Sequence, residues 1–176
     1  LLGCEIPERA TVLRVILAEL TRIASHLMFI GSMALDLGAS SPFLYAWRER
    51  EKILDFFEGM SGVRMMTSFI RPGGLVRDLD QALVDDISAF TDTMPGYIDS
   101  YEELLTGNPI FKERTESVGV LSGQDALDLG VSGPTLRASG VALDIRKSNP
   151  YCGYEAYDFA VPTGNVGDCY DRYLVR

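Results

Sequence analysis

The sequence predicts a mainly α-helical fold, with a bundle of long helices over residues 1–107 and short helices, loops and short strands over residues 108–176. Two observations carry this prediction. Apolar residues recur at intervals of three and four through most of the first part, which is the period of an amphipathic helix. After Asn108-Pro109 the sequence becomes richer in glycine and proline, and these residues interrupt longer elements.

The first helix is expected to begin at Pro7, since proline suits a first helical position, and Glu8 favours the positive end of the helix dipole. Apolar residues then recur at helical spacing, at Leu13, Ile16, Leu17, Leu20, Ala24, Leu27 and Met28. A polar stripe of Glu19, Arg22 and His26 lies on another side. For a lone histidine, a structural partnership is the simpler interpretation.

A second helix is expected from Pro42 to about Gly59, opened by Ser40-Ser41. Its apolar rows contain two charges, Arg50 in one row and Glu49 in the adjacent row. Such charges either form a salt bridge with a packed neighbour or line a polar path. Because buried ion pairs do not reliably add stability, a functional role stays open beside the structural one.

The motif RPGGL, Arg71 to Leu75, is expected to turn tightly or to let the backbone approach something closely, because it holds two glycines. A third helix is expected from about Asp80 to Leu105, where apolar residues again define one face. Pro95 lies inside it and should kink the helix or split it into two.

The C-terminal part is expected to contain only short elements. Short helices are expected at residues 110–117 and 122–129, loops at 132–140 and 146–159, and short strands at 141–143 and 157–162. The last residues, Asp168 to Arg176, look like a capped helix start that stops after two turns, and Leu1-Leu2-Gly3 begins apolar without an initiator methionine. Both ends therefore look truncated, and we expect residues 1–176 to be the central helical part of one larger domain.

The composition argues against several functions. Acidic residues outnumber basic ones by 25 to 16, and this net charge of −9 argues against nucleic-acid binding, which needs a basic surface. The three cysteines, Cys4, Cys152 and Cys169, form no CxxC pair, and His26 is the only histidine, so we expect no metal site in this chain. The sparse, odd cysteine count suits a reducing cytoplasm. No Walker pattern and no GxGxxG after a strand is present, which argues against a nucleotide site.

Asp36 is the most informative single residue, because it is the only charge between Leu27 and Trp47. An ionised carboxylate is costly to bury in apolar surroundings, so it must find a partner, shift its pKa or touch water. The alternative is that Asp36 only ends a helix before Gly38. The stretch does not span a membrane, because Asp36 divides it into charge-free runs of nine and eleven residues, whereas a spanning helix needs about twenty.

Seven motifs, in matching order across the whole chain, resemble one protein family. They are ERATVLRVILAEL, RIASHL, ALDLGASSPF, REREKILDFFE, RPGGL, GPTLRASG and RKSNPYCGYEAYDF. The sequence resembles the 49-kDa subunit (also called the D subunit) of respiratory complex I, the NADH–quinone oxidoreductase. That subunit is similar to the large subunit of nickel–iron hydrogenases. The resemblance implies a helical core of that hydrogenase-like fold, and it covers the central part of the subunit.

The resemblance also implies a function and a set of site residues. Together with the iron–sulfur B subunit, this family forms the quinone headgroup cavity and couples quinone reduction to proton translocation. In the family a histidine and a tyrosine contact the headgroup, and the histidine is linked to an aspartate that matches Asp36. Both headgroup residues would lie upstream of Leu1, so this chain alone is not expected to be active. We expect Glu49, Arg50 and Arg71 to belong to a buried polar network.

Met66 marks a departure from the family pattern. Many relatives have RMH where this chain has Arg64-Met65-Met66, and that histidine donates a hydrogen bond to the terminal iron–sulfur cluster of the B subunit. A methionine cannot donate such a bond, so we expect a cluster of lower potential and a low-potential quinone such as menaquinone.

Partners, cofactors and location are likewise implied by the resemblance. The expected partners are the B and C subunits and quinone, and the expected cofactors of the full complex are NADH, FMN and iron–sulfur clusters, none of them bound by this chain. The expected location is peripheral, on the cytoplasmic side of the bacterial inner membrane. Two alternatives stay open. One is a hydrogenase or hydrogenlyase large subunit, which would hold nickel and iron with CxxC pairs. The other is a non-catalytic helical scaffold.

Overall fold

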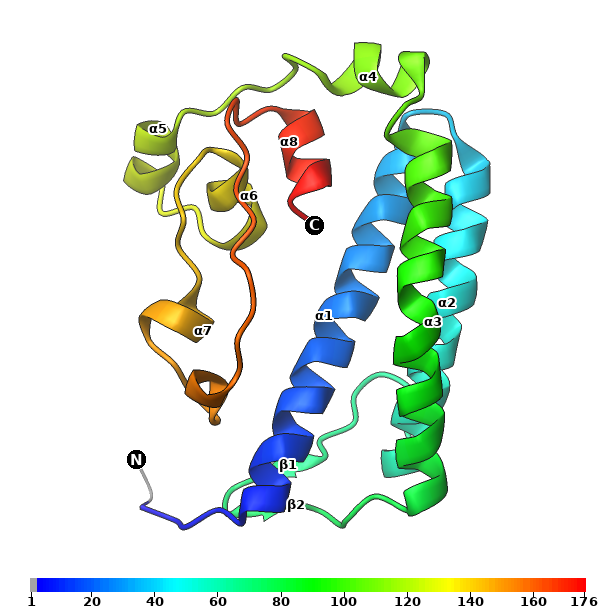
Figure 1. Ribbon diagram of the computed structural model, residues 1–176, viewed down its shortest axis with the longest axis vertical. Helices are drawn as coiled ribbons and strands as arrows, with labels where there is room; N and C mark the ends of the chain where they lie inside the picture. Colours follow the sequence, from blue (N-terminus) through cyan, green and yellow to red (C-terminus); the bar gives the residue numbers. More distant parts are fainter. Residues whose placement is uncertain (1–2) are drawn as a thin grey trace. The chain divides into compact units, whose positions relative to one another are not determined.

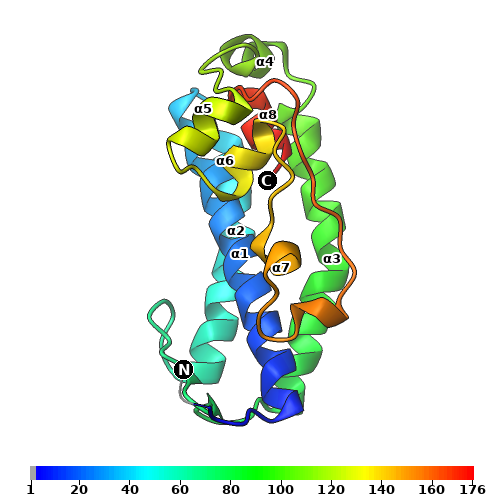
Figure 2. The ribbon, with the colours of Figure 1, turned by 90° about the vertical axis from the view of Figure 1, so that its left-hand side faces the viewer.

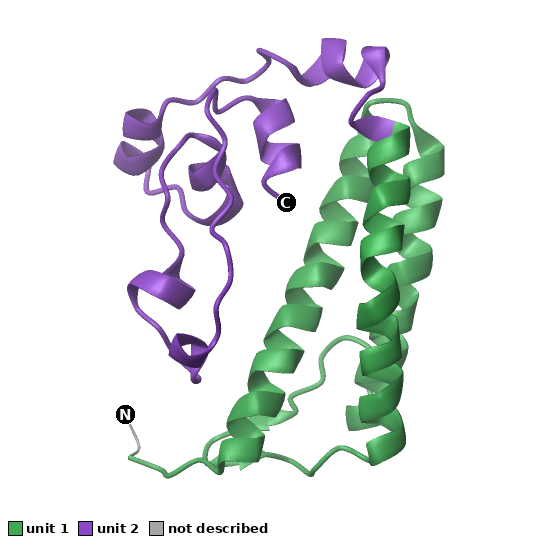
Figure 3. Cartoon of the chain, in the orientation of Figure 1, with its two compact units in different colours: residues 1–104 green, residues 105–176 purple. Residues whose placement is uncertain are grey.

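A computed structural model describes residues 3–176 and confirms a mainly helical fold (Figure 1). The chain divides into two compact units, one reaching to Leu104 and the other running from Leu105 to Arg176 (Figure 3).

The first unit is built on three long helices. They are α1 (Glu8–Asp36), α2 (Ser40–Ser61) and α3 (Gln81–Leu105). A turn of three residues reverses the chain between α1 and α2, and the two helices then lie side by side in Figure 1 and Figure 2. Apolar side chains from all three helices form one buried core, which includes Leu20, Leu27, Ile53, Met60, Phe90 and Met94. Full burial of one such side chain contributes about 1.5–3 kcal/mol.

The long helices differ from the expectations in where the first one begins and in whether the third one is continuous. The first helix begins at Glu8, one residue later than expected, with Pro7 at the N-cap. The third helix continues through Pro95, so the alternative of two separate helices is wrong. Proline costs a helix one backbone hydrogen bond. Packing offsets this cost, because Phe90, Met94 and Tyr101 bury their side chains on both sides of Pro95.

The RPGGL motif forms a small antiparallel hairpin, as its two glycines indicated. Strand β1 (Ile70–Arg71) pairs with β2 (Gly74–Leu75) in the register Ile70↔Leu75 and Arg71↔Gly74. Gly73 has a φ of +84°, a left-handed conformation that favours glycine. The hairpin is therefore the tight turn that the sequence predicted.

The second unit consists of short helices joined by irregular segments. These are α4 (Pro109–Thr115), α5 (Gly123–Asp128), α6 (Gly133–Ala138), α7 (Ile145–Ser148), the 3-10 helix η1 (Tyr154–Ala156) and α8 (Cys169–Leu174). The expected helices at 110–117 and 122–129 are confirmed as α4 and α5. Four side-chain caps explain where helices start. Asn108 for α4, Ser122 for α5, Asp144 for α7 and Asp168 for α8 each accept a backbone N–H from the first turn.

The expectations for four segments of the second unit were wrong. The segments expected as strands, 141–143 and 157–162, form no strand, and the loop segments expected at 132–140 and 146–159 contain α6, η1 and most of α7. The Leu143 N–H bonds to the carbonyl of Val141, 2.8 Å away, so this segment folds on itself instead of pairing. Pro134 in the first turn of α6 favours a helix start, and this cue outweighs the flanking glycines.

Gly167 holds two distant segments of the second unit together. The Leu121 N–H donates to the Gly167 carbonyl at 2.9 Å. A Cβ at Gly167 would lie 2.2 Å from the carbonyl oxygen of Leu121, and the φ of Gly167 is +75°. A side chain at Gly167 would collide with this backbone oxygen. It would also strain the backbone, because residues with a side chain rarely adopt a φ of this sign.

We expect Gly167→Ala to destabilise the protein by roughly 2–4 kcal/mol, because overpacking and backbone strain add. Thermal unfolding followed by circular dichroism measures this loss. Gly107→Ala is the matched control, because nothing lies within 4 Å of its added Cβ and its φ is not positive. Equal melting temperatures for the two variants would contradict the prediction.

Candidate functional site

Asp36 is the last residue of α1, and its side chain is exposed. The backbone itself closes the helix end, because the Ala39 N–H donates to the carbonyl of Ala34 at 2.8 Å and the Gly38 N–H to that of Leu35 at 2.9 Å. Within residues 3–176 the carboxylate has no hydrogen bond or ion pair. A negative charge at a helix C-terminus faces the negative end of the helix dipole, which is unfavourable. Asp36 therefore gives the helix no side-chain cap and is available to a group from elsewhere.

A close contact between α1 and α2 fixes the turn that carries Asp36. Gly31 lies against the ring of Trp47, and a Cβ there would be 3.2 Å from that ring. Trp47 stacks on Phe43 with the ring centroids 4.2 Å apart. Arg50 also lies over Trp47, with its guanidinium carbon 5.5 Å from the ring centroid. The two helices can approach this closely because the residue at position 31 has no side chain.

Glu49 is the most deeply buried charge of the first unit, with 0% of its side chain exposed. Its Oε1 accepts a hydrogen bond from Arg48 Nε at 2.5 Å, and its Oε2 lies 2.9 Å from Lys52 Nζ. Lys52 also donates to the Tyr97 hydroxyl of α3 at 2.9 Å. The buried carboxylate therefore sits in a polar cluster that links α2 to α3.

The charges of this cluster change the pKa values of its members in a consistent way. The hydrogen bond to Glu49 raises the pKa of Arg48. The bonds to Tyr97 and Glu49 raise the pKa of Lys52, and Lys52 in turn lowers the pKa of Tyr97. Burial, followed by the charge of Glu49, raises the pKa of Tyr101. The raised pKa values of Arg48 and Lys52 both favour their protonated, positively charged forms beside Glu49.

The structure does not gather the three residues that we expected to form one buried network. Glu49 is buried, Arg50 lies over Trp47 instead of meeting Glu49, and Arg71 on β1 is exposed. No motif in the sequence singled out Arg48 and Lys52. The signal was present, because a lysine three residues after Glu49 lies on the same side of a helix.

Met66 lies in the segment between α2 and β1, and its side chain is 81% exposed. Two neighbouring apolar residues, Val63 and Met65, are also exposed. This segment therefore presents apolar side chains to the surroundings of the chain.

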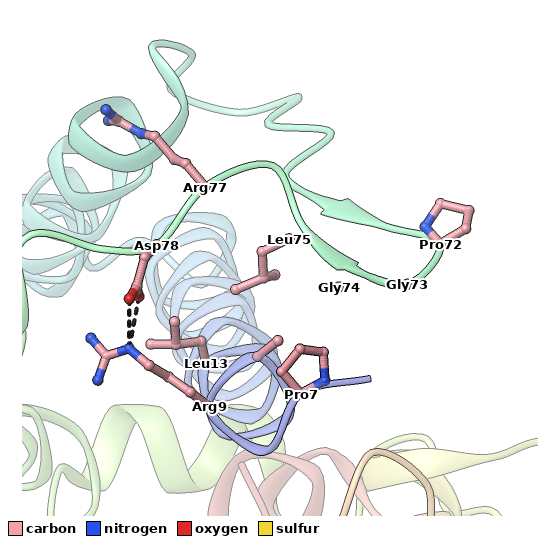
Figure 4. Close-up of a pocket in the computed structure, with 10 residues that line it drawn as sticks. Pro7, Arg9, Leu13, Pro72, Gly73, Gly74, Leu75, Arg77 and Asp78 are labelled. Carbon is pink, nitrogen blue, oxygen red and sulfur yellow. Dashed lines mark hydrogen bonds and ion pairs between the residues drawn. The ribbon is translucent and has the colours of Figure 1, made fainter. Parts of the chain in front are cut away.

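A hollow of about 420 Å³ lies between the start of α1 and the hairpin (Figure 4). Ala10 and Leu13 of α1 line it together with Pro7 at the N-cap of that helix, and Pro72 to Leu75 line it from the hairpin. Arg9 Nε donates to both carboxylate oxygens of Asp78, each at 2.8 Å, across one side of the hollow, and the Leu79 N–H also donates to Asp78. The lining is mostly apolar, and its one carboxylate, Asp78, is paired with Arg9. The hollow therefore has no free acid or base for catalysis and is better suited to binding an apolar group.

Two arginines, Arg14 and Arg77, hold the hairpin in place. The sequence motifs predicted a role for neither of them. Arg14 of α1 donates to the carbonyls of Arg71 at 2.7 Å and Gly74 at 2.9 Å. Arg77 points away from the hollow, toward the end of α2, where it donates to the carbonyls of Met60 and Gly59. These bonds satisfy carbonyls that the turn and the helix end leave open.

The second unit contains its own buried ionic cluster, centred on Asp144. Arg146 donates to Asp144 from its backbone N–H and its Nε, both at 3.0 Å, and from Nη2 at 2.7 Å. Arg137, itself buried, lies 3.6 Å from the same carboxylate. The bonds from Arg146 lower the pKa of Asp144 to about 2. The sequence analysis did not single out this cluster, because Arg137 and Asp144 come together only through the fold.

Residues 3–176 hold neither a metal site nor a helix suited to a membrane. No group of three or more His, Cys, Asp or Glu side chains in this range could hold a metal ion. None of the helices in the same range has the length and apolarity needed to cross a membrane.

Known proteins are similar to this chain over its whole length. The sequence profile of the family described as "Respiratory-chain NADH dehydrogenase, 49 Kd subunit" matches residues 36–176. A D subunit of the NADH-quinone oxidoreductase of Roseiflexus sp. (strain RS-1) is 60% identical over all 176 residues, which are 42% of that relative's length. The corresponding D subunits of Geotalea uraniireducens and Rickettsia typhi are 53% and 51% identical, each with 45% of its length covered. The chain spans less than half the length of these relatives.

We expect the Asp144 cluster to make stability depend on pH in the acid range. Because the pKa of Asp144 is about 2 in the folded state, below its usual value of 3.8, the cluster stabilises the fold above pH 4. This stability is lost as the pH falls from 4 toward 2, by roughly 2 kcal/mol. Urea unfolding at pH 5 and pH 2 should show a smaller acid loss for Asp144→Asn than for the unchanged protein.

Asp128→Asn serves as the control for this measurement, because Asp128 is exposed and accepts only a bond from Gln124. Its acid loss should equal that of the unchanged protein. Parallel losses for all three proteins would show that Asp144 does not carry the effect.

Proposed function

The chain belongs to the family of the 49-kDa subunit of respiratory-chain NADH dehydrogenase, and we propose that it forms part of the quinone-reduction module of that enzyme. The observation that carries this proposal is the exposed, unpartnered carboxylate of Asp36. It lies in the motif ALDLGASSPF, at the end of α1, exposed and without a partner among the described residues. A carboxylate in this position can bind a cation or a protonated base that another segment supplies.

Asp36 is proposed to pair with a histidine of the quinone site from outside residues 1–176. Reduction of a quinone consumes two electrons and two protons and builds negative charge on its oxygens. A protonated histidine neutralises that charge, and a carboxylate beside it keeps the imidazole protonated until the proton leaves. The loss of that proton changes the charge next to Asp36. This change is proposed as the local event that couples quinone reduction to proton translocation.

The proposed partners are the other subunits of the complex, above all the B subunit with the terminal cluster and the C subunit. NADH, FMN, iron–sulfur clusters and quinone are the proposed cofactors and substrate of the whole enzyme, with none bound by this chain. The exposed apolar residues around Met66 support a contact with another subunit on this side. The proposed location is peripheral, on the cytoplasmic side of the bacterial inner membrane.

Arg50 remains a proposed member of the polar surroundings of the site, and Glu49 is proposed to keep α2 in place against α3. Arg71 is not proposed there, because its hairpin lies beside the start of α1 and Asp36 is at the other end of that helix. The relatives described above all carry the oxidoreductase name, which favours this function over a hydrogenase large subunit. A scaffold without a chemical role is the second candidate. The exposed apolar side chains at the surface of the chain favour it as much as they favour contact with another subunit.

Replacement of Asp36 by asparagine in the full complex separates these two candidates. We expect NADH oxidation by quinone to fall at least about tenfold, because the histidine loses the charge that keeps it protonated. NADH oxidation by ferricyanide, which accepts electrons upstream, should stay unchanged.

Asp92→Asn is the matched control, because Asp92 lies exposed on α3 and both activities should survive its replacement. If Asp36→Asn keeps both activities, or loses both together with assembly, the scaffold is the better description.

Replacement of Met66 by histidine tests the proposed lower potential of the terminal cluster. A histidine can donate a hydrogen bond to the cluster, and such bonds raise the reduction potential. Redox titration followed by electron paramagnetic resonance should show a higher midpoint potential, which falls as the histidine loses its proton. Met65→His is the control at the neighbouring position, and equal potentials in both variants and the unchanged complex would remove Met66 from this role.

A further inference from the structure

Arg48 is held in one orientation by three neighbours. Its Nε donates to the buried Glu49 carboxylate at 2.5 Å. The rings of Tyr45 and Tyr97 lie near its guanidinium, whose carbon is 5.4 Å and 5.5 Å from the two ring centroids. Arginine stacks favourably on aromatic rings. The side chain therefore needs no further ordering to meet a ligand.

The outer edge of the Arg48 guanidinium is open. The side chain is 53% exposed, and within residues 3–176 its two terminal nitrogens have no hydrogen-bond partner. These nitrogens form one edge of the planar fork, which matches a carboxylate or a phosphate in two parallel bonds. Arg48 is thus anchored through Nε, and its two terminal nitrogens remain able to donate hydrogen bonds to a ligand.

The cluster also carries an excess positive charge. Glu49 supplies one negative charge, whereas Arg48 and Lys52 supply two positive charges, and both cations reach the surface. This local excess of one positive charge stands out in a chain with a net charge of −9. It equals the charge of one carboxylate, whereas a phosphate monoester brings nearly two.

Apolar and aromatic surface surrounds this open edge. Leu44, one turn before Arg48, is 65% exposed, and Tyr45 is also exposed. Arginine and tyrosine are among the residue types that most often dominate binding energy at protein interfaces. An immobilised arginine beside exposed apolar side chains fits a protein segment better than a free ion.

We propose that Arg48, with Leu44 and Tyr45 beside it, is a docking site for an Asp or Glu side chain of another protein chain. Glu49 and Lys52 act behind it, because they fix the guanidinium and supply the excess charge. The proposal does not depend on quinone chemistry or on Asp36. A loss of docking with quinone reduction intact, or the reverse, distinguishes the two.

The test uses the full-length protein in its purified complex, with the photoreactive residue p-benzoylphenylalanine in place of Leu44. After irradiation, mass spectrometry of the covalent product should identify a peptide of another chain that contains Asp or Glu. Arg48→Gln should lower the yield of this product at least about fivefold, in line with the loss of one charge-assisted hydrogen-bond pair. Arg48→Lys keeps the charge beside Glu49 but not the fork, and it should also lower the yield.

Arg64→Gln is the matched control. Arg64 is similarly exposed and pairs with Glu51, Asp55 and Glu58, but no aromatic ring holds it, and its loss should leave the yield unchanged. Replacing the captured acidic residue by arginine should remove the product, and combining that change with Arg48→Glu should restore it. A product on a lipid or on residues 105–176 of the same chain, the absence of any product, or equal yields for Arg48→Gln and Arg64→Gln would overturn the proposal.

Discussion

The close packing of α1 against α2 is the constraint on which the candidate site depends. Gly31 lets the Trp47 ring approach the backbone of α1, and a side chain there would meet the ring at 3.2 Å. This contact lies five residues before Asp36, so it fixes both the direction in which α1 ends and the face of α2 that returns along it. Because protein interiors are densely packed, a side chain at position 31 would have to push the Trp47 ring aside. The turn at Asp36 therefore takes its position from a residue that has no side chain.

Charge burial follows the same principle in both units but with different geometry. Glu49 is neutralised mainly by its own helix, through Arg48 and Lys52. Asp144 is bound by Arg146, two residues later in the sequence, and by Arg137. In each case one carboxylate meets two cations, which is how a charge away from water becomes tolerable. The cations differ in exposure, because Arg137 is buried whereas Arg48 and Lys52 reach the surface. Of these two clusters, the one around Glu49 therefore presents its excess charge to a partner.

The sequence predicted the long helices well, because each has a sustained apolar face that packing against the others can bury. It failed where two cues conflict over a few residues. Gly133 and Gly140 suggested a loop around α6, but Pro134 starts a helix there. The residues 157–162 have strand-forming side chains, but a strand also needs a neighbour to pair with. The cluster of Arg48, Glu49, Lys52 and Tyr97 could be foreseen only in part, because its link to Tyr97 joins residues 45 positions apart.

The exposure of Asp36 agrees with a site assembled from several segments. If the carboxylate were satisfied within this chain, it would already have a donor, and a histidine from elsewhere would have to displace that donor. The turn after α1 satisfies its backbone through Ala39 and Gly38 instead, and the helix dipole adds to the negative field at Asp36. A positively charged partner is therefore favoured at this position more than at a helix start. The fold thus leaves the Asp36 carboxylate as one half of a proposed ion pair, and an incoming protonated base would be the other half.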